Sequence, residues 1–165
     1  MIPVVLLHAL GLDATMWTDQ RHALREIGHP VVAFDQPDYG ATPPSLDVVV
    51  EDLARTLDER GIDEIALAGS SMGGYVAMAF LRRFPWRVRA LALLATRAEA
   101  DDPDTAAGRL RFADLVVDSA AREAILAATT PKLVGATTRA RRPEVVTRLR
   151  AITEAIPPGS LAWSQ

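Results

Sequence analysis

A serine between two glycines is the residue of this sequence best suited to covalent chemistry. The run Gly69-Ser70-Ser71-Met72-Gly73-Gly74 fits the pattern G-x-S-x-G, with Ser71 as the central serine. An apolar segment, IALAG, leads into the run, and a helical pattern, YVAMAFLRRF, follows it. A serine on a sharp strand-to-helix turn projects its hydroxyl outward, where it can attack a carbonyl carbon. The spacing therefore predicts Ser71 as a nucleophile.

The two glycines of this pattern have a steric explanation. A Cβ atom at Gly69 or Gly73 would collide with neighbouring backbone in so tight a turn. The alternative interpretation is an ordinary glycine-rich turn that contains two serines by chance. The strand before the turn and the helix after it favour the nucleophile.

Four apolar segments must form the framework that positions Ser71. They are IPVVLLHA, HPVVAFDQ, IDEIALAGS and VRALALLAT. Each is apolar throughout, as expected for strands covered by helices on both faces. Amphipathic stretches at about residues 13–27, 46–60 and 72–84 connect them, the first with Asp13 as its N-cap. This alternation predicts an α/β fold with a parallel sheet of about four strands, flanking helices and right-handed crossovers.

The character of the chain changes after Thr96. Residues 97–165 contain no convincing strand and predict about four short helices, with breaks at Pro103, Pro131, Pro143 and Pro157. We therefore expect an α/β core at residues 1–96 and a helical segment at residues 97–165. Three apolar residues are expected in the core rather than in a pocket: Trp17, Phe112 and Leu115.

Composition excludes several kinds of chemistry and partner. The 165 residues, 49% hydrophobic and 24% charged, are typical of a globular protein. The sequence has no cysteine, which excludes disulfides, thiolate metal sites and a cysteine nucleophile. The net charge is −3, and the basic run at residues 139–142 is interpreted as a solvated turn that flanks a helix, so nucleic acid is not an expected partner. With no signal-peptide pattern and no apolar run of about 18 residues, we expect a soluble, cytoplasmic protein.

Two further motifs point to a known family. His8-Ala9-Leu10-Gly11 follows the first predicted strand and resembles the H-G-x-G element of the α/β-hydrolase superfamily. The run from Asp35 to Thr42 looks like the D-x-x-G-x-G-x-S/T loop of the same family, although it departs from that pattern at positions 38–41. With the G-x-S-x-G turn, these motifs make residues 2–96 similar to the N-terminal part of small bacterial esterases and enol-lactonases. The resemblance implies that residues 97–165 form a helical cap.

The resemblance also implies roles for individual residues. Ser71 would be the nucleophile, and the backbone N–H groups of Leu10 and Met72 would form the oxyanion hole, which stabilises charge on a carbonyl oxygen. Ala9 stands where glycine is usual in the family. We interpret His8 as a structural residue that ties down its loop. Asp35 and Asp38 are expected to shape a turn and a pocket wall rather than to act in catalysis.

The catalytic triad that the resemblance implies is incomplete in this sequence. The family order is nucleophile, acid, histidine, but all three histidines, at positions 8, 22 and 29, precede Ser71. Asp101 and Asp102 are second-choice candidates for the acid, because most family members place it after a further strand, which would lie beyond residue 165. We therefore expect a truncated α/β-hydrolase core that lacks two strands, their helices, the histidine and the usual acid.

The expected function follows from the implied nucleophile and from the missing histidine and acid. We expect a serine hydrolase for a carboxylic ester or lactone, in which this chain alone is weakly active or inactive. The alternatives are a non-catalytic binding or scaffold module, and a carbon–carbon hydrolase or perhydrolase on the same scaffold. The expected partners are the small-molecule substrate and either a complementing C-terminal fragment or a second copy, docked on the exposed edge of VRALALLAT. No cofactor or metal is expected.

Overall fold

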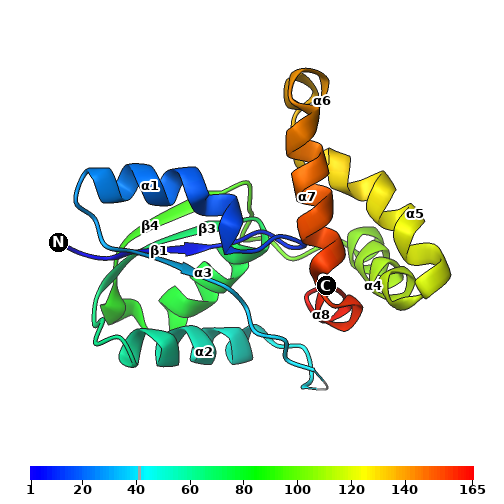
Figure 1. The fold of residues 1–165 in the computed structure, drawn as a ribbon. Coiled ribbons are helices and arrows are strands. Elements are labelled where there is room, and N and C mark those ends of the chain that lie inside the picture. Colours follow the sequence, from blue (N-terminus) through cyan, green and yellow to red (C-terminus); the bar gives the residue numbers. More distant parts are fainter. Residues whose placement is uncertain (41) are drawn as a thin grey trace. The chain divides into compact units, whose positions relative to one another are not determined.

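The computed structural model describes residues 1–40 and 42–165, which form two compact units (Figure 1). The first unit comprises residues 1–37 and 44–99, and the second comprises residues 38–43 and 100–165. The structural division thus falls after Glu99, whereas the sequence places it after Thr96. It also assigns residues 38–43 to the helical unit.

A parallel sheet forms the centre of the first unit. Its four strands lie in the order β2-β1-β3-β4. They are β1 (Val4–Leu7), β2 (Val31–Phe34), β3 (Ile65–Ser70) and β4 (Val88–Leu94). The predicted fold class and all four predicted strands are confirmed. Because the strands are parallel, the loops that follow β1, β2, β3 and β4 all begin at the same edge of the sheet.

Helices lie on both faces of this sheet (Figure 1). Helix α1 (Thr18–Glu26) lies on one face, and α2 (Leu46–Asp58) and α3 (Met72–Arg83) lie on the other. Short 3-10 turns, η1 (Ala14–Trp17) and η2 (Pro85–Arg87), precede α1 and β4. The three predicted helices are confirmed, although the first begins with η1. Asp13 caps that turn, accepting the Thr15 N–H at 2.9 Å.

The core of the first unit lies between α2, α3 and the sheet. Helix α2 carries a stripe of buried residues at helical spacing: Val49, Val50, Leu53 and Leu57, each at most 1% exposed. Ser45 begins this helix by accepting the Asp47 N–H, and Gly61 follows its end with a φ of 63°. Phe80 of α3 and Leu67 of β3 complete the same apolar layer.

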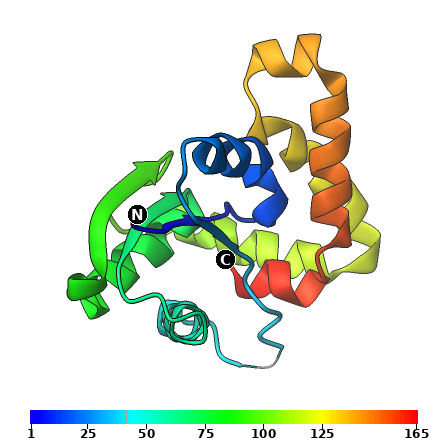
Figure 2. The same ribbon diagram turned by 60° about the vertical axis from the view of Figure 1, so that its left-hand side comes forward.

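Strand β4 departs from the prediction of burial on both faces. Every residue from Arg89 to Leu94 is exposed, and Leu91, Leu93 and Leu94 are 37%, 45% and 43% exposed. The cause is its position, because β4 is an edge strand that pairs with β3 alone among the described residues (Figure 2). The central strands β1 and β3 are buried as predicted, with Val5 and Leu67 at most 1% exposed.

The second unit is helical, with five α-helices and one 3-10 turn in residues 100–165. They are α4 (Pro103–Val117), α5 (Ser119–Thr129), η3 (Thr130–Leu133), α6 (Ala136–Arg141), α7 (Pro143–Ala155) and α8 (Pro158–Trp163). Val116, Leu126 and Leu161 form its core, and Phe112 packs against them. Leu115 is 37% exposed, so its predicted core position is wrong, whereas Trp17 of the first unit is 6% exposed and confirmed.

Two arginines of this unit bind groups that are close to them in the sequence. In the basic run at residues 139–142, Arg139 donates to the carbonyls of Pro131 and Val134, and Arg142 pairs with Glu144 at 3.1 Å.

Within residues 1–40 and 42–165, no helix has both the length and the apolar composition needed to cross a membrane.

Candidate active site

Ser71 forms a sharp turn between β3 and α3. Strand β3 ends at Ser70 and α3 begins at Met72, so Ser71 alone makes the connection. Its φ is 51° and its ψ is −113°, a backbone conformation that non-glycine residues rarely adopt. Such a conformation costs about 1–3 kcal/mol and persists only where surrounding structure holds it. The Ser71 N–H donates to the Leu94 carbonyl at 2.9 Å, and no hydrogen bond of its hydroxyl is found in the described residues.

Close backbone contacts explain Gly69 and Gly73 at this turn. A Cβ atom at Gly69 would lie 2.7 Å from the Gly74 nitrogen and nearer still to the Gly73 carbonyl. A Cβ atom at Gly73 would lie 2.7 Å from the His8 carbonyl oxygen and nearer still to that of Leu7. Both distances are too short for non-bonded atoms, so these two glycines allow α3 to start directly against the ends of β1 and β3.

A third glycine, Gly74, and a threonine, Thr96, complete the turn, and sequence reasoning singled out neither of them. A Cβ atom at Gly74 would lie 2.6 Å from the Cβ of Thr96. The Thr96 hydroxyl donates to the Ser71 carbonyl at 2.9 Å. Thr96 follows β4 closely, and the only signal that could have identified it is this position at the end of a strand adjacent to β3.

The loop after β1 lies beside the first turn of α3. Gly73 contacts the Leu7 and His8 carbonyls, so the loop that contains Leu10 starts next to Met72. The backbone N–H groups of Leu10 and Met72, the predicted oxyanion donors, make no hydrogen bond within the described residues. Ala9 has an ordinary negative φ, so alanine fits where the family usually has glycine. Both N–H groups thus lack a partner among the described residues.

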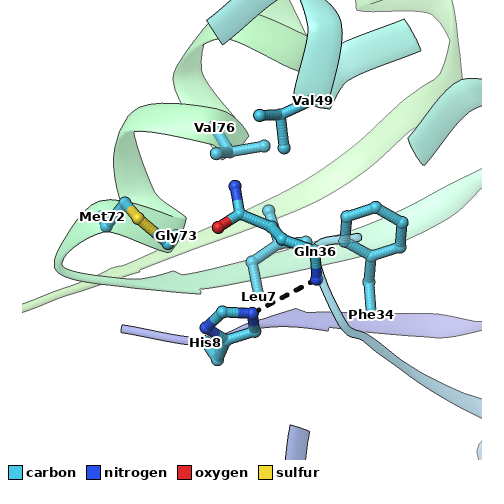
Figure 3. A pocket seen from close by; sticks show the side chains of 8 residues that line it. All are labelled: Leu7, His8, Phe34, Gln36, Val49, Met72, Gly73 and Val76. Carbon is cyan, nitrogen blue, oxygen red and sulfur yellow. Dashed lines mark hydrogen bonds between the residues drawn. The ribbon is translucent and has the colours of Figure 1, made fainter. Parts of the chain in front are cut away.

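A small hollow beside Met72 is mostly apolar (Figure 3), and neither Leu10 nor Ser71 lines it. Its empty volume is about 180 Å³, including space open to solvent. Figure 3 shows the Gln36 carboxamide extending into it toward Val76. The hollow is lined by β1, β2, α2, α3 and adjoining residues: Leu7, His8, Phe34, Gln36, Val49, Met72, Gly73 and Val76.

His8 is fixed by contacts at both ring nitrogens. It is 8% exposed, with Nδ1 2.9 Å from the Ala9 carbonyl oxygen and Nε2 3.4 Å from the Gln36 nitrogen. These contacts fit a neutral imidazole that donates from Nδ1 and accepts at Nε2. Asp35 fixes the same region, because its carboxylate accepts the Ala14 N–H at 2.5 Å. The structural interpretation of both residues is supported.

The other two histidines lie away from Ser71. His22 is on α1 and pairs with Glu26 at 3.2 Å, with 77% of its side chain exposed. His29 precedes β2 and therefore lies at the opposite edge of the sheet from Ser71, which follows β3. Within the described residues, no histidine forms a hydrogen bond with Ser71.

The two candidate acids belong to the second unit and have local partners. Asp101 forms an ion pair with Arg109. Asp102 caps α4, accepting the Thr105 N–H and the Thr105 hydroxyl, each at 2.8 Å. The Thr105 N–H, followed by the Thr105 hydroxyl, lowers the pKa of Asp102. Both carboxylates thus have structural roles, and neither is brought to Ser71 by a hydrogen bond.

Asp38 also acts within the second unit. Its carboxylate accepts the Gly40 N–H at 3.0 Å and the Ser160 hydroxyl at 2.9 Å. Both hydrogen bonds lower the pKa of Asp38, and the bond from Gly40 has the larger effect. The Trp163 indole donates to the Thr42 carbonyl at 2.6 Å. Residues 38–43 are thereby joined to α8, which agrees with a structural role for Asp38.

Comparison with known proteins identifies relatives of this architecture. The family model for the alpha/beta hydrolase fold matches residues 2–152. A 2-hydroxy-6-oxo-2,4-heptadienoate hydrolase of Pseudomonas putida is 38% identical over 100 residues, which cover 56% of this chain and 36% of that protein. The chain thus matches little more than a third of this curated relative.

Solved structures of similar fold are also hydrolases that this chain covers only in part. A thermophilic esterase from Thermogutta terrifontis superposes with a TM-score of 0.89 and 33% identity, covering 98% of this chain and 61% of that one. An enol-lactonase from Burkholderia xenovorans gives a TM-score of 0.84 and 25% identity, covering 99% and 63%. Each of these relatives therefore contains a large part with no counterpart in residues 1–165.

Proposed function

Because this chain belongs to the alpha/beta hydrolase fold family, we propose that Ser71 is the nucleophile of a serine hydrolase acting on carboxylic esters or lactones. The observation that carries the proposal is the backbone of Ser71, a single residue with φ 51° between β3 and α3. The similarity to an esterase and to an enol-lactonase supports this choice of substrate class. A strained residue at a strand–helix junction is a common feature of functional sites.

The proposed reaction uses groups at the carboxyl edge of the sheet. The Ser71 oxygen attacks the carbonyl carbon while its proton passes to a base, and the carbonyl oxygen gains negative charge. The N–H groups of Leu10 and Met72 would donate to this oxygen, and loss of one such donor typically costs about 3–4 kcal/mol of barrier. The leaving alcohol departs with a proton, and water then hydrolyses the acyl-serine. The positive end of the α3 dipole favours the same charge.

The base is the component that residues 1–165 do not offer in a suitable place. His8 is held at both nitrogens, and His22 and His29 lie on α1 and at the far edge of the sheet. We propose that a complementing polypeptide supplies the histidine and the acid. It would dock on β4, whose backbone groups on one side and apolar side chains are exposed. A second copy of this chain is the weaker candidate, because it would bring only the same three histidines.

A second reaction is favoured by one specific similarity. The Pseudomonas putida relative is named as a hydrolase of 2-hydroxy-6-oxo-2,4-heptadienoate, whose hydrolysis breaks a carbon–carbon bond next to a ketone. This reaction also begins at a carbonyl group and would use the same N–H donors. Hydrolysis of p-nitrophenyl esters and lactones, compared with that of a 6-oxo-dienoate, distinguishes the two reactions.

The nucleophile is tested by covalent labelling with diethyl p-nitrophenyl phosphate. We expect mass spectrometry to locate the diethylphosphoryl group on Ser71, and the label to be lost in Ser71→Ala. Ser70→Ala is the matched control, because Ser70 is the adjacent serine at the end of β3, and it should keep the label. The labelling is then repeated after a polypeptide has been added that corresponds to the part of the Thermogutta esterase that this chain does not match. If Ser71 is not labelled with or without this polypeptide, a non-catalytic module is the remaining function.

A further inference from the structure

Thr96 contacts the Ser71 turn from a segment 25 residues further along the chain. The Ser71 carbonyl oxygen accepts two hydrogen bonds, each at 2.9 Å, from the Gly74 N–H and from the Thr96 hydroxyl. The first bond is part of the start of α3. The second comes from outside the turn and is made by a side chain.

The segment from Leu94 to Thr96 holds both sides of Ser71. The Leu94 carbonyl accepts the Ser71 N–H at 2.9 Å, and the Thr96 hydroxyl binds the Ser71 carbonyl. Between them, Ala95 has a φ of 49°. It and Ser71 are the two non-glycine residues with positive φ in the described part of the chain. Two strained residues therefore face each other across this pair of hydrogen bonds.

Packing fixes the Thr96 side chain in this place. Its Cβ and Oγ1 would each lie 2.6 Å from a Cβ atom at Gly74, so the glycine leaves the space that Thr96 fills. A side chain confined in this way loses little further freedom when it donates a hydrogen bond. Thr96 is thus set against the first turn of α3, which carries Met72.

We propose that Thr96 is a positioning residue, whose hydroxyl holds the Ser71 carbonyl and thereby keeps the Ser71 hydroxyl and the Met72 N–H in their reactive orientation. The inference rests on the proposed role of Ser71. Thr96 itself touches no reacting atom and acts through the peptide group between Ser71 and Met72. Its hydroxyl, rather than its methyl group, carries the effect.

Two substitutions separate the hydroxyl from the packing. Thr96→Val keeps the shape and removes the donor, whereas Thr96→Ser keeps the donor and removes the methyl group that packs on Gly74. Net loss of a neutral hydrogen bond is worth about 0.5–1.5 kcal/mol, or about 2- to 13-fold in rate. We therefore expect Thr96→Val to slow phosphorylation of Ser71 by that factor and Thr96→Ser to stay within about twofold of wild type.

Thermal unfolding of the same variants tests for a merely structural role. If Thr96 only supported the fold, the labelling rates of Thr96→Val and Thr96→Ser would fall in the same order as their melting temperatures. Retained labelling in Thr96→Ser together with slow labelling in Thr96→Val supports the inference. Equal rates in Thr96→Val and wild type overturn it while leaving the role of Ser71 intact.

A structural readout covers the case in which wild-type Ser71 does not react. That result would remove the proposed function, and the backbone amide chemical shifts of Ser71 and Met72 would then decide the inference alone. We expect these shifts to move in Thr96→Val and to stay near wild type in Thr96→Ser. Unchanged shifts in Thr96→Val would show that the hydroxyl does not hold the turn.

Discussion

The Ser71 turn depends on three residues that lack a Cβ atom. Gly69, Gly73 and Gly74 each face an atom that leaves no space for a side chain. At Gly69 and Gly73 that atom belongs to the backbone, which cannot rotate away as a flexible side chain can. The two glycines of the G-x-S-x-G pattern therefore have a steric role that is independent of any reaction at Ser71.

We expect opposite effects from two glycine substitutions inside helices. Gly73→Ala should lower the free energy of unfolding by at least about 1–3 kcal/mol, because the methyl group overlaps the Leu7 and His8 carbonyls. Gly108→Ala, in α4, meets nothing within 4 Å and should raise it by about 0.5–1 kcal/mol through helix propensity. Urea denaturation measures both. Equal effects at the two positions would contradict the steric explanation.

Asp102 gives a prediction about pH. Its hydrogen bonds from the Thr105 N–H and hydroxyl lower the pKa of this carboxyl below the ordinary value for an aspartate. A lowered pKa means that the ionised form stabilises the folded state above about pH 4, and that this stabilisation disappears as the pH falls through the lower folded value. Asp102→Asn retains a side chain that can cap α4 but removes the titration.

We therefore expect wild type to be more stable than Asp102→Asn near neutral pH, with the difference shrinking below about pH 4. Denaturation followed by circular dichroism at a series of pH values measures the difference. A difference that stays constant down to about pH 2 would show that the carboxylate charge does not contribute.

Among the elements of the sheet, β4 differs most from expectation, because most of its residues are apolar but exposed to solvent. Its apolar sequence suits a strand covered on both faces, yet Leu91, Leu93 and Leu94 are exposed at an edge. An edge with unpaired backbone groups and apolar side chains pairs readily with another strand. The same strand ends in the segment that holds Ser71, so a polypeptide docked on β4 would lie next to the turn.

A charge on β4 should therefore reduce self-association. We expect Leu93→Glu to lower the apparent mass of the chain at high concentration, measured by light scattering after size-exclusion chromatography. Leu133→Glu is the matched control, because Leu133 is 47% exposed against 45% for Leu93 and lies in the helical unit. The same decrease in both variants would indicate a general solubility effect and would argue against pairing at β4.

For the whole molecule, local sequence patterns predict the helices and strands. The partners of Thr96 and the placement of residues 38–43 depend instead on contacts between residues distant in sequence. The four strands and three connecting helices follow from apolar runs and helical spacing, and the G-x-S-x-G turn from its glycines. Thr96 could not be predicted, because its partner Ser71 is brought close only by the pairing of β3 with β4. Residues 38–43 join the helical unit through contacts such as that of Thr42 with Trp163, which lie 121 positions apart.

We propose that residues 1–165 contain a nucleophilic serine, Ser71, without its base. The most direct test of this proposal is the rate of Ser71 phosphorylation by diethyl p-nitrophenyl phosphate, measured from pH 6 to pH 9. Without a base, the reactive serine alkoxide increases about tenfold per pH unit, so the rate should rise steadily over the whole range. A histidine base would instead give a plateau above its pKa, near 6.5 for an unperturbed imidazole. A plateau near neutral pH would show that a base acts on Ser71, and phosphorylation at another residue would show that Ser71 is not the nucleophile.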